Sequence, residues 1–115
     1  MKARFQADND LRKAILRGVV RSEPRIDFRS AQAARFDGVP DPEVLAFSAD
    51  AGRILVSHDF QTIPGHFQQI TRERSGPGVF LVRQDLPVSR AVETLRLICE
   101  ASDADEWINR IGGSN

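Results

Sequence analysis

The sequence predicts one α/β domain with three layers, in which helices cover both faces of a central, mostly parallel sheet. Stretches typical of strands alternate along the chain with apolar residues at helical spacing. The stretches 53–57 and 79–82 are continuously apolar, which is typical of strands buried on both faces of a parallel sheet. The 115 residues fit a single domain (1–115), with an expected core at 1–86 and C-terminal helices at 87–111.

The first third of the chain predicts a strand, a helix and a second strand. Residues 3–7 form the first strand, which ends where Asp8, Asn9 and Asp10 favour a turn. Apolar residues then recur at helical spacing from Leu11 to Val19. Alternation over 25–29 predicts the second strand, and 30–40 is compatible with either a helical turn or a loop.

A second helix is predicted from Asp41 to about residue 50. Asp41 has the residue type of an N-cap, Pro42 suits the first helical position, and Glu43 adds a favourable charge to the first turn. Gly52 is expected to end this helix, and the buried strand 53–57 follows it.

The C-terminal part predicts a third helix opening at Thr62, the strand 79–82, and a fourth helix at 87–101. A last short helix is expected at 103–111, with Trp107 and Ile108 directed inward. Apolar side chains in these last helices allow either packing within the chain or a two-fold homodimer. They are Val88, Leu95, Ile98 and Trp107.

Composition excludes several classes of protein. Sixteen basic and sixteen acidic residues cancel, which argues against a protein that coats nucleic acid, but not against a nuclease with local contacts. The single cysteine, Cys99, excludes an intramolecular disulfide and a zinc site of paired thiolates. The apolar stretches are shorter than the roughly 18 residues of a membrane helix, and charge comes early at the N-terminus. We therefore expect a cytoplasmic protein with no membrane partner.

Acidic residues follow the predicted strands, where ligands bind in open parallel sheets. Asp8 follows the first strand, Asp41 opens the helix after the second, and Asp59 follows the third. Asp10 and Glu43 lie beside them in sequence and are expected to assist. Carboxylates of this kind suit Mg²⁺ or Mn²⁺, which can support hydrolysis of a phosphodiester. The alternative is that each aspartate only caps a helix or turn.

Histidines add a second possibility near the same edge. His58 is expected to contact a phosphate or to support a metal ligand, and a zinc site of His58, Asp59 and His66 is the alternative. The sequence lacks the glycine-rich phosphate loops of nucleotide-binding proteins and the GxSxG motif of hydrolases.

Several segments together resemble the small PIN-like family. They are FQADN (5–9), DPEVL (41–45), GRILVSHD (52–59) and GPGVFLV (76–82), and HDFQTIPGHF (58–67) resembles a subgroup with the pattern His-Asp-x-x-Thr-x-Pro-x-His. The resemblance spans residues 3 to 83 and maps the acidic residues of the family to Asp8, Asp41 and Asp59. Asn9 and Gln61 stand where family members often have further acids.

This resemblance implies a PIN-like fold and a Mg²⁺- or Mn²⁺-dependent endoribonuclease that acts as the toxin of a bacterial toxin–antitoxin pair. RNA would be the substrate and a cognate antitoxin the partner. The loss of two acids leaves a catalytically inactive module, which binds a partner protein or itself, as the alternative. A phosphatase-like or nucleotide-binding role at the same edge is a third reading.

Overall fold

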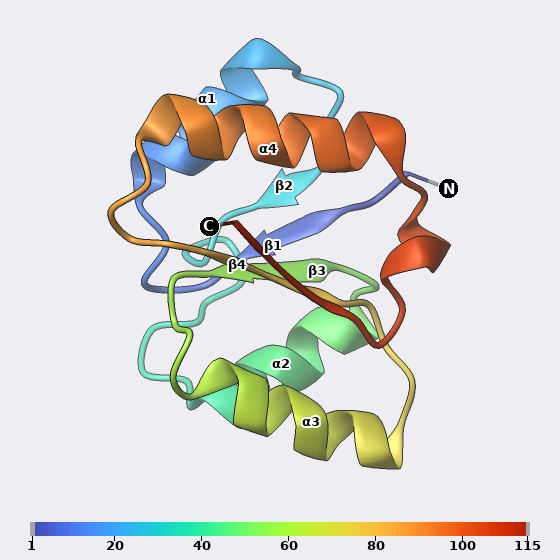
Figure 1. Cartoon of the computed structure of the whole chain (residues 1–115). Helices are drawn as coiled ribbons and strands as arrows, with labels where there is room; N and C mark the ends of the chain where they lie inside the picture. The colour runs from blue at the N-terminus through green and yellow to red at the C-terminus, as the bar shows by residue number, and fades with distance from the viewer. Residues whose placement is uncertain (1, 115) are drawn as a thin grey trace.

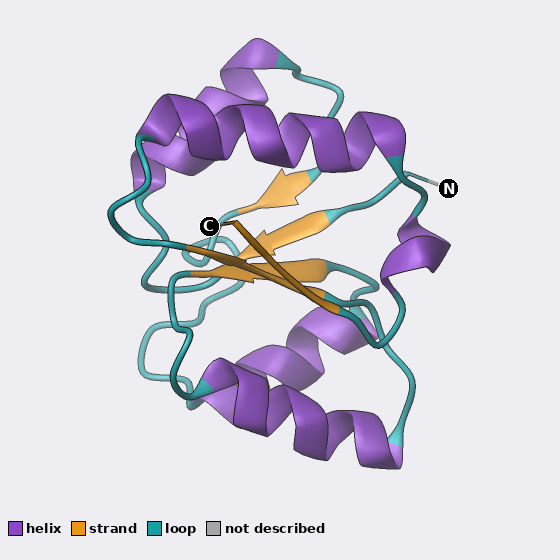
Figure 2. Cartoon of the chain, viewed as in Figure 1, coloured by secondary structure: helices purple, strands orange, loops and turns teal. Residues whose placement is uncertain are grey.

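The computed structural model describes residues 2–114 and confirms the predicted three-layer α/β/α class. Figure 1 shows the helices α1 (Lys13–Ser22) and α4 (Val88–Ala101) on one face of the sheet, and α2 (Asp41–Asp50) and α3 (Ile63–Glu73) on the other. In Figure 2 the strands form one layer between these two pairs of helices.

All neighbouring strands of the five-stranded sheet run parallel, in the order β2-β1-β3-β4-β5. The strands are β1 (Phe5–Ala7), β2 (Phe28–Arg29), β3 (Ile54–Ser57), β4 (Val79–Val82) and β5 (Ile111–Ser114). The chain leaves β1 in one direction to form β2, and then returns to the other side of β1 to form β3. Strand order therefore reverses between β1 and β3, which is where α/β sheets open a crevice at the carboxyl ends of the strands.

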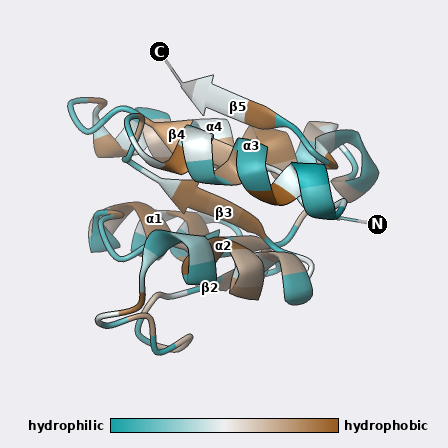
Figure 3. Ribbon diagram, turned by 90° about the horizontal axis from the view of Figure 1, so that it is seen from below, coloured by the Kyte–Doolittle hydropathy of each residue, from teal (hydrophilic) through white to brown (hydrophobic). Residues whose placement is uncertain are grey.

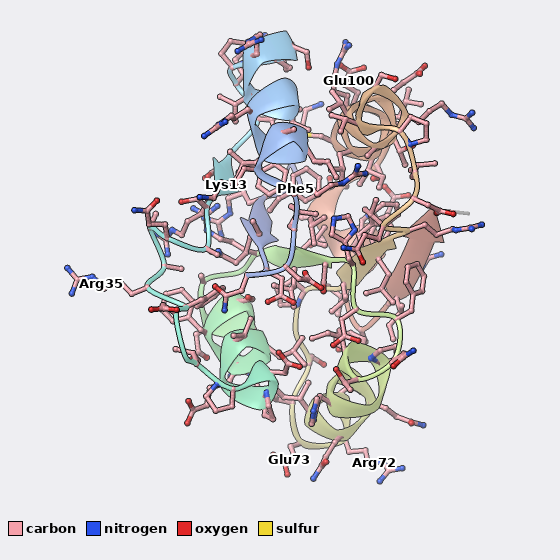
Figure 4. All side chains as sticks on the ribbon, turned by 90° about the vertical axis from the view of Figure 1, so that its left-hand side faces the viewer. Phe5, Lys13, Arg35, Arg72, Glu73 and Glu100 are labelled. Carbon is pink, nitrogen blue, oxygen red and sulfur yellow. The ribbon has the colours of Figure 1, made fainter. Side chains whose placement is uncertain are left out.

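Two clusters of buried side chains hold the layers together. One lies under α1 and α4 and includes Phe5, Ile15 and Leu95, each 0% exposed. The other lies under α2 and α3 and includes Val44 and Phe67. Figure 3 shows the apolar residues concentrated in the strands between the helices, and Figure 4 shows Phe5 between the layers. Burial of each such side chain contributes about 1.5–3 kcal/mol to folding.

The segment expected to form a last helix at 103–111 differs from that prediction. A short 3-10 helix, η1 (Ala104–Trp107), is followed by the edge strand β5. The Trp107 ring packs edge-on against Phe80 with 5.9 Å between centroids, but Ile108 is 46% exposed rather than inward. A Cβ on Gly112 would come within 2.6 Å of the Trp107 ring, so glycine allows the strand to pass this close to the indole.

The bounds of other elements also differ from the prediction. The expected strand 25–29 is reduced to β2, and residues 30–40 form turns that bury Phe36. Residues 87–114 also contribute to the core, since α4 packs on α1 and β5 completes the sheet. The four apolar side chains considered for a dimer pack in the cluster under α1 and α4: Val88, Leu95, Ile98 and Trp107.

Within residues 2–114, no helix has the length and apolar character needed to span a membrane.

Candidate functional site

Asp8 lies directly after the carboxyl end of β1, beside the reversal of strand order, and is only 5% exposed. Its Oδ1 accepts a hydrogen bond of 2.8 Å from the backbone N–H of Asn9, and its Oδ2 accepts one of 2.8 Å from Ser57 Oγ. Ser57 is the last residue of β3 and is fully buried. The two adjacent strands thus bring a carboxylate and a hydroxyl together at their ends.

The hydroxyl of Ser57 also contacts a second carboxylate. Its Oγ lies 3.2 Å from Asp10 Oδ1, which in addition accepts the backbone N–H of His58 at 3.2 Å. The same Oγ accepts the backbone N–H of Asp59 at 3.0 Å. A serine hydroxyl carries one proton. Asp8 and Asp10 therefore share a single hydroxyl proton between two carboxylates.

Thr62 connects a second pair of carboxylates in the same way. Its Oγ1 lies 3.2 Å from Asp41 Oδ2 and also hydrogen-bonds Asp59 Oδ2. Asp59 Oδ1 accepts the backbone N–H groups of Gln61 and Thr62, both at 2.9 Å, which forms a turn into α3. The side chains of residues 41 and 59 are thus brought together, and Asp59 also has the turn-forming role considered from the sequence.

Electrostatics connect the two pairs. Burial raises the pKa of Asp8 above its ordinary value, and repulsion from Asp10 and Asp41 adds to the increase, against the hydrogen bonds from Ser57 and Asn9. For Asp59, burial acts to raise the pKa, but hydrogen bonds from Thr62 and Gln61 together with the charge of His66 lower it overall. The pKa values of Asp8 and Asp59 are thus shifted in opposite directions.

His58 has a different environment from the one expected. Its ring is buried, with Nδ1 2.8 Å from the carbonyl oxygen of Val82 and Nε2 3.2 Å from the backbone nitrogen of Arg12. The carbonyl requires a donor at Nδ1 and the N–H requires an acceptor at Nε2, which selects the neutral tautomer with the proton on Nδ1. The ring therefore links the end of β4 to the start of α1, and both of its nitrogens are used within the chain.

Two further candidates lie at the margin of the group. The prediction of Asp41 as N-cap is wrong, because Pro40 holds that position and Asp41 is the first residue of α2, with its side chain directed to Thr62. Glu43 is exposed in the same first turn, and among the described residues no hydrogen bond or ion pair joins it to the other acids.

Two clefts flank the carboxylates. One of about 240 Å³ is lined by Asp8 and Asn9 together with Lys13 and Arg17 of α1 and Gln32 of the loop after β2. Lys13 and Arg17 are exposed and, within residues 2–114, form no ion pair. Figure 4 looks onto this edge, with Lys13 labelled on the α1 side. In such a cleft the carboxylate could contact a metal ion, while the two cationic side chains could contact an anionic ligand beside it.

The second cleft, of about 570 Å³, includes His58 in its lining. Asp10, Asp59, Phe60 and Arg83 are among the residues that line it. The acidic group therefore separates two concave surfaces, each of which has at least one cationic side chain at its wall.

The chemistry of these donors fits a hard divalent cation, although a complete shell is not assembled. Among the described residues, no three His, Cys, Asp or Glu side chains form a group ready to hold a metal ion. Mg²⁺ commonly uses one or two carboxylates and keeps several waters. Asp8 and Asp10, which contact the same hydroxyl, are two carboxylates that lie close together here.

Sequence reasoning missed the two hydroxyls that organise the site. The sequence predicts Ser57 as part of a buried strand and Thr62 as a helix start, whereas in the structure each contacts two carboxylates. A polar residue that ends an apolar strand directly before His58 and Asp59 was the signal for Ser57. No sequence signal predicted that Lys13 and Arg17 would line the cleft of Asp8, since this depends on how α1 packs.

Comparison with known proteins gives no relative: no family model matches the chain, and no curated protein or solved structure matches it. The PIN-like resemblance therefore rests on the motifs of the sequence.

Proposed function

We propose that this protein is a Mg²⁺- or Mn²⁺-dependent endoribonuclease of the PIN-like type. The observation that carries the proposal is the pair of carboxylates on Ser57, where Asp8 and Asp10 share one hydroxyl proton. Burial raises the pKa of Asp8, and repulsion from the nearby carboxylate of Asp10 adds to the increase. A divalent cation would offset that charge.

Asp8 and Asp10 would hold the ion, with Asp41 close enough to Asp8 to influence its charge. A bound Mg²⁺ supplies a water of lowered pKa and neutralises charge on a phosphodiester during hydrolysis. Asp59 positions Thr62 and the start of α3, and His58 positions the ends of β3 and β4. We therefore propose that both residues hold neighbouring elements in place. The contacts of His58 leave neither of its ring nitrogens for a phosphate.

Lys13 and Arg17 support a polyanionic substrate. They lie one helical turn apart on α1 and line the same cleft as Asp8. Cations beside a metal-binding carboxylate can neutralise the phosphates on either side of a scissile bond. A net charge of zero gives no overall attraction to nucleic acid, but this local cationic surface could attract an RNA strand to the site.

The test is cleavage of a single-stranded RNA with and without Mg²⁺, using protein purified in parallel with an Asp8→Asn variant. We expect cleavage that requires Mg²⁺ or Mn²⁺, is lost with chelator, and falls at least a hundredfold in the variant. Cleavage that is equal in both proteins, or independent of divalent ions, would remove the proposal.

A catalytically inactive module is the second candidate, and the contacts of His58 and Asp59 favour it. Both side chains are committed to structural hydrogen bonds, and Gln61 is amide rather than acid. This candidate predicts tight binding to a partner protein without any effect of Mg²⁺ on the melting temperature, since an ion that binds only the folded chain must stabilise it.

The toxin role implied by the resemblance is tested separately. Induced expression of the wild-type chain in bacteria should arrest growth, and Asp8→Asn should relieve the arrest at equal protein level. Growth that is unaffected by the wild-type chain would remove the toxin role, while leaving the nuclease proposal to its own assay.

A further inference from the structure

The outer edge of β5 has unpaired backbone groups. In the parallel register with β4, Val79 pairs with Ile111 and its N–H donates to the carbonyl of Arg110 at 2.9 Å. This pattern turns both polar backbone groups of Gly112 toward β4, and those of Ile111 and Gly113 away from it. Figure 3 shows β5 at one margin of the molecule, and no strand or helix within residues 2–114 lies beyond it.

This edge also lacks the features that normally protect edge strands. Residues 111–114 include no charged residue and no proline. The opposite edge, β2, is only two residues long and ends in Arg29. Unprotected edges of this kind favour pairing with another strand.

Exposed apolar side chains accompany the edge on one face. Gly112 faces Trp107, so Ile111 and Gly113 face the opposite side, where α3 lies. Ile111 is 44% exposed and Phe60 is 42% exposed. A Cβ on Gly113 would lie 3.8 Å from the Phe60 ring, so bare glycine leaves this ring open beside the strand.

We propose that this edge pairs with β5 of a second copy of the chain, antiparallel about a two-fold axis through Gly112. Ile111 then lies opposite Gly113 of the other copy, and each such pair exchanges both backbone hydrogen bonds. In this register each Ile111 side chain covers the bare glycine and the adjacent Phe60 of the other copy. The pairing joins two sheets into one continuous sheet and covers the two exposed apolar side chains together.

Self-pairing is favoured over an unrelated strand because the edge complements itself in this one register. Its large side chain, Ile111, is placed opposite the position without a side chain, Gly113, on both sides of the axis. The inference does not rest on the proposed nuclease activity, because Ile111, Gly112 and Gly113 lie outside the acidic group, although Phe60 also lines the second cleft beside Asp10 and Asp59.

The test is the mass of the chain in solution, measured by sedimentation velocity up to about 200 µM, a range suited to a small interface. We expect the wild type to approach twice 12.8 kDa with rising concentration. Gly113→Pro removes an outward N–H that the monomer does not use, and should weaken dimerisation at least tenfold. Gly113→Ala keeps that N–H but adds a methyl group where Ile111 of the other copy packs, so it should weaken dimerisation less than Gly113→Pro does.

Ile111→Lys tests the apolar contact, with Ile108→Lys as its matched control, because Ile108 is similarly exposed but lies outside β5. We expect the first variant to be monomeric and the second to dimerise like the wild type. Circular dichroism and melting temperature establish that each variant is folded. A monomeric wild type, or dimers that persist in both Gly113→Pro and Ile111→Lys, would overturn the proposal.

Discussion

Ser57 Oγ lies 2.8 Å from Asp8 Oδ2, so the last residue of β3 donates its hydroxyl proton to the carboxylate that follows β1. The same oxygen lies 3.2 Å from Asp10, and one proton cannot satisfy both carboxylates at full strength. This relationship links the fold to the proposed chemistry, because it exists only where strand order reverses between β1 and β3.

Asp8→Asn should raise the melting temperature at pH 7 in the absence of divalent ions. The pKa of Asp8 is raised in the folded chain, so its favourable contribution is full below the unfolded pKa and is lost as pH rises through the folded pKa. Asparagine carries no charge at any pH, so the variant does not lose this stability as pH rises. Scanning calorimetry from pH 3 to pH 8 should show equal stability at the acidic end and a more stable variant at neutral pH; a less stable variant throughout would contradict the assignment.

Ser57→Ala should destabilise the chain by about 1–3 kcal/mol, because Asp8 and Asp10 lose their shared donor. The loss should grow as pH rises through the raised pKa of Asp8 and that carboxylate ionises. Ser48→Ala is the matched control, since Ser48 is also buried but donates to the neutral carbonyl of Val44 at 2.8 Å. Urea unfolding at pH 5 and pH 8 separates the two: a pH-independent loss at Ser57 would argue against the shared-proton account.

Asp59 provides a test of positioning against charge. Asp59→Ala should cost about 1 kcal/mol, because the N–H groups of Gln61 and Thr62 lose their acceptor, whereas Asp59→Asn should retain most of the stability. The pKa of Asp59 is lowered, so its own contribution is present above the unfolded pKa and is lost as pH falls through the folded pKa. Equal destabilisation by both substitutions would show that the charge, and not the turn, is what stabilises.

Lys13→Ala with Arg17→Ala should weaken binding of single-stranded RNA, measured by fluorescence anisotropy in chelator so that cleavage cannot interfere. Loss of two phosphate contacts should lower the slope of log K against log salt by about 1.4. Arg72→Ala with Arg90→Ala is the control, because both arginines are exposed on other helices. Figure 4 shows Arg72 at the far end of the molecule from Lys13. A similar loss of affinity in both double variants would indicate nonspecific charge.

The three-layer arrangement could be predicted from the sequence. Continuously apolar strands must be buried on both faces, and apolar residues at helical spacing must be buried on one face of each helix. β5 could not be predicted, since Gly112 and Gly113 have low strand propensity and the close approach of Gly112 to the Trp107 ring accompanies this strand. That approach depends on tertiary packing, which local patterns do not contain.

The candidate site was predicted in its location but not in its detail. The rule for carboxyl ends of parallel strands brought Asp8, Asp41 and Asp59 to one edge. The structure adds which atoms meet: Asp8 with Asp10 on Ser57, and Asp41 with Asp59 on Thr62. The two nitrogens of His58 are occupied by backbone groups of residues distant in sequence, which no spacing within 58–66 could indicate.

The most direct measurement is isothermal titration of Mn²⁺ into the wild type, Asp8→Asn and Asp105→Asn, the last as a control acid away from this edge. The account predicts one saturable site in the wild type and in Asp105→Asn, and no saturable binding in Asp8→Asn. A wild type that binds no Mn²⁺, or an Asp8→Asn variant that binds it as well as the wild type does, would contradict the claim that these carboxylates form a cation site.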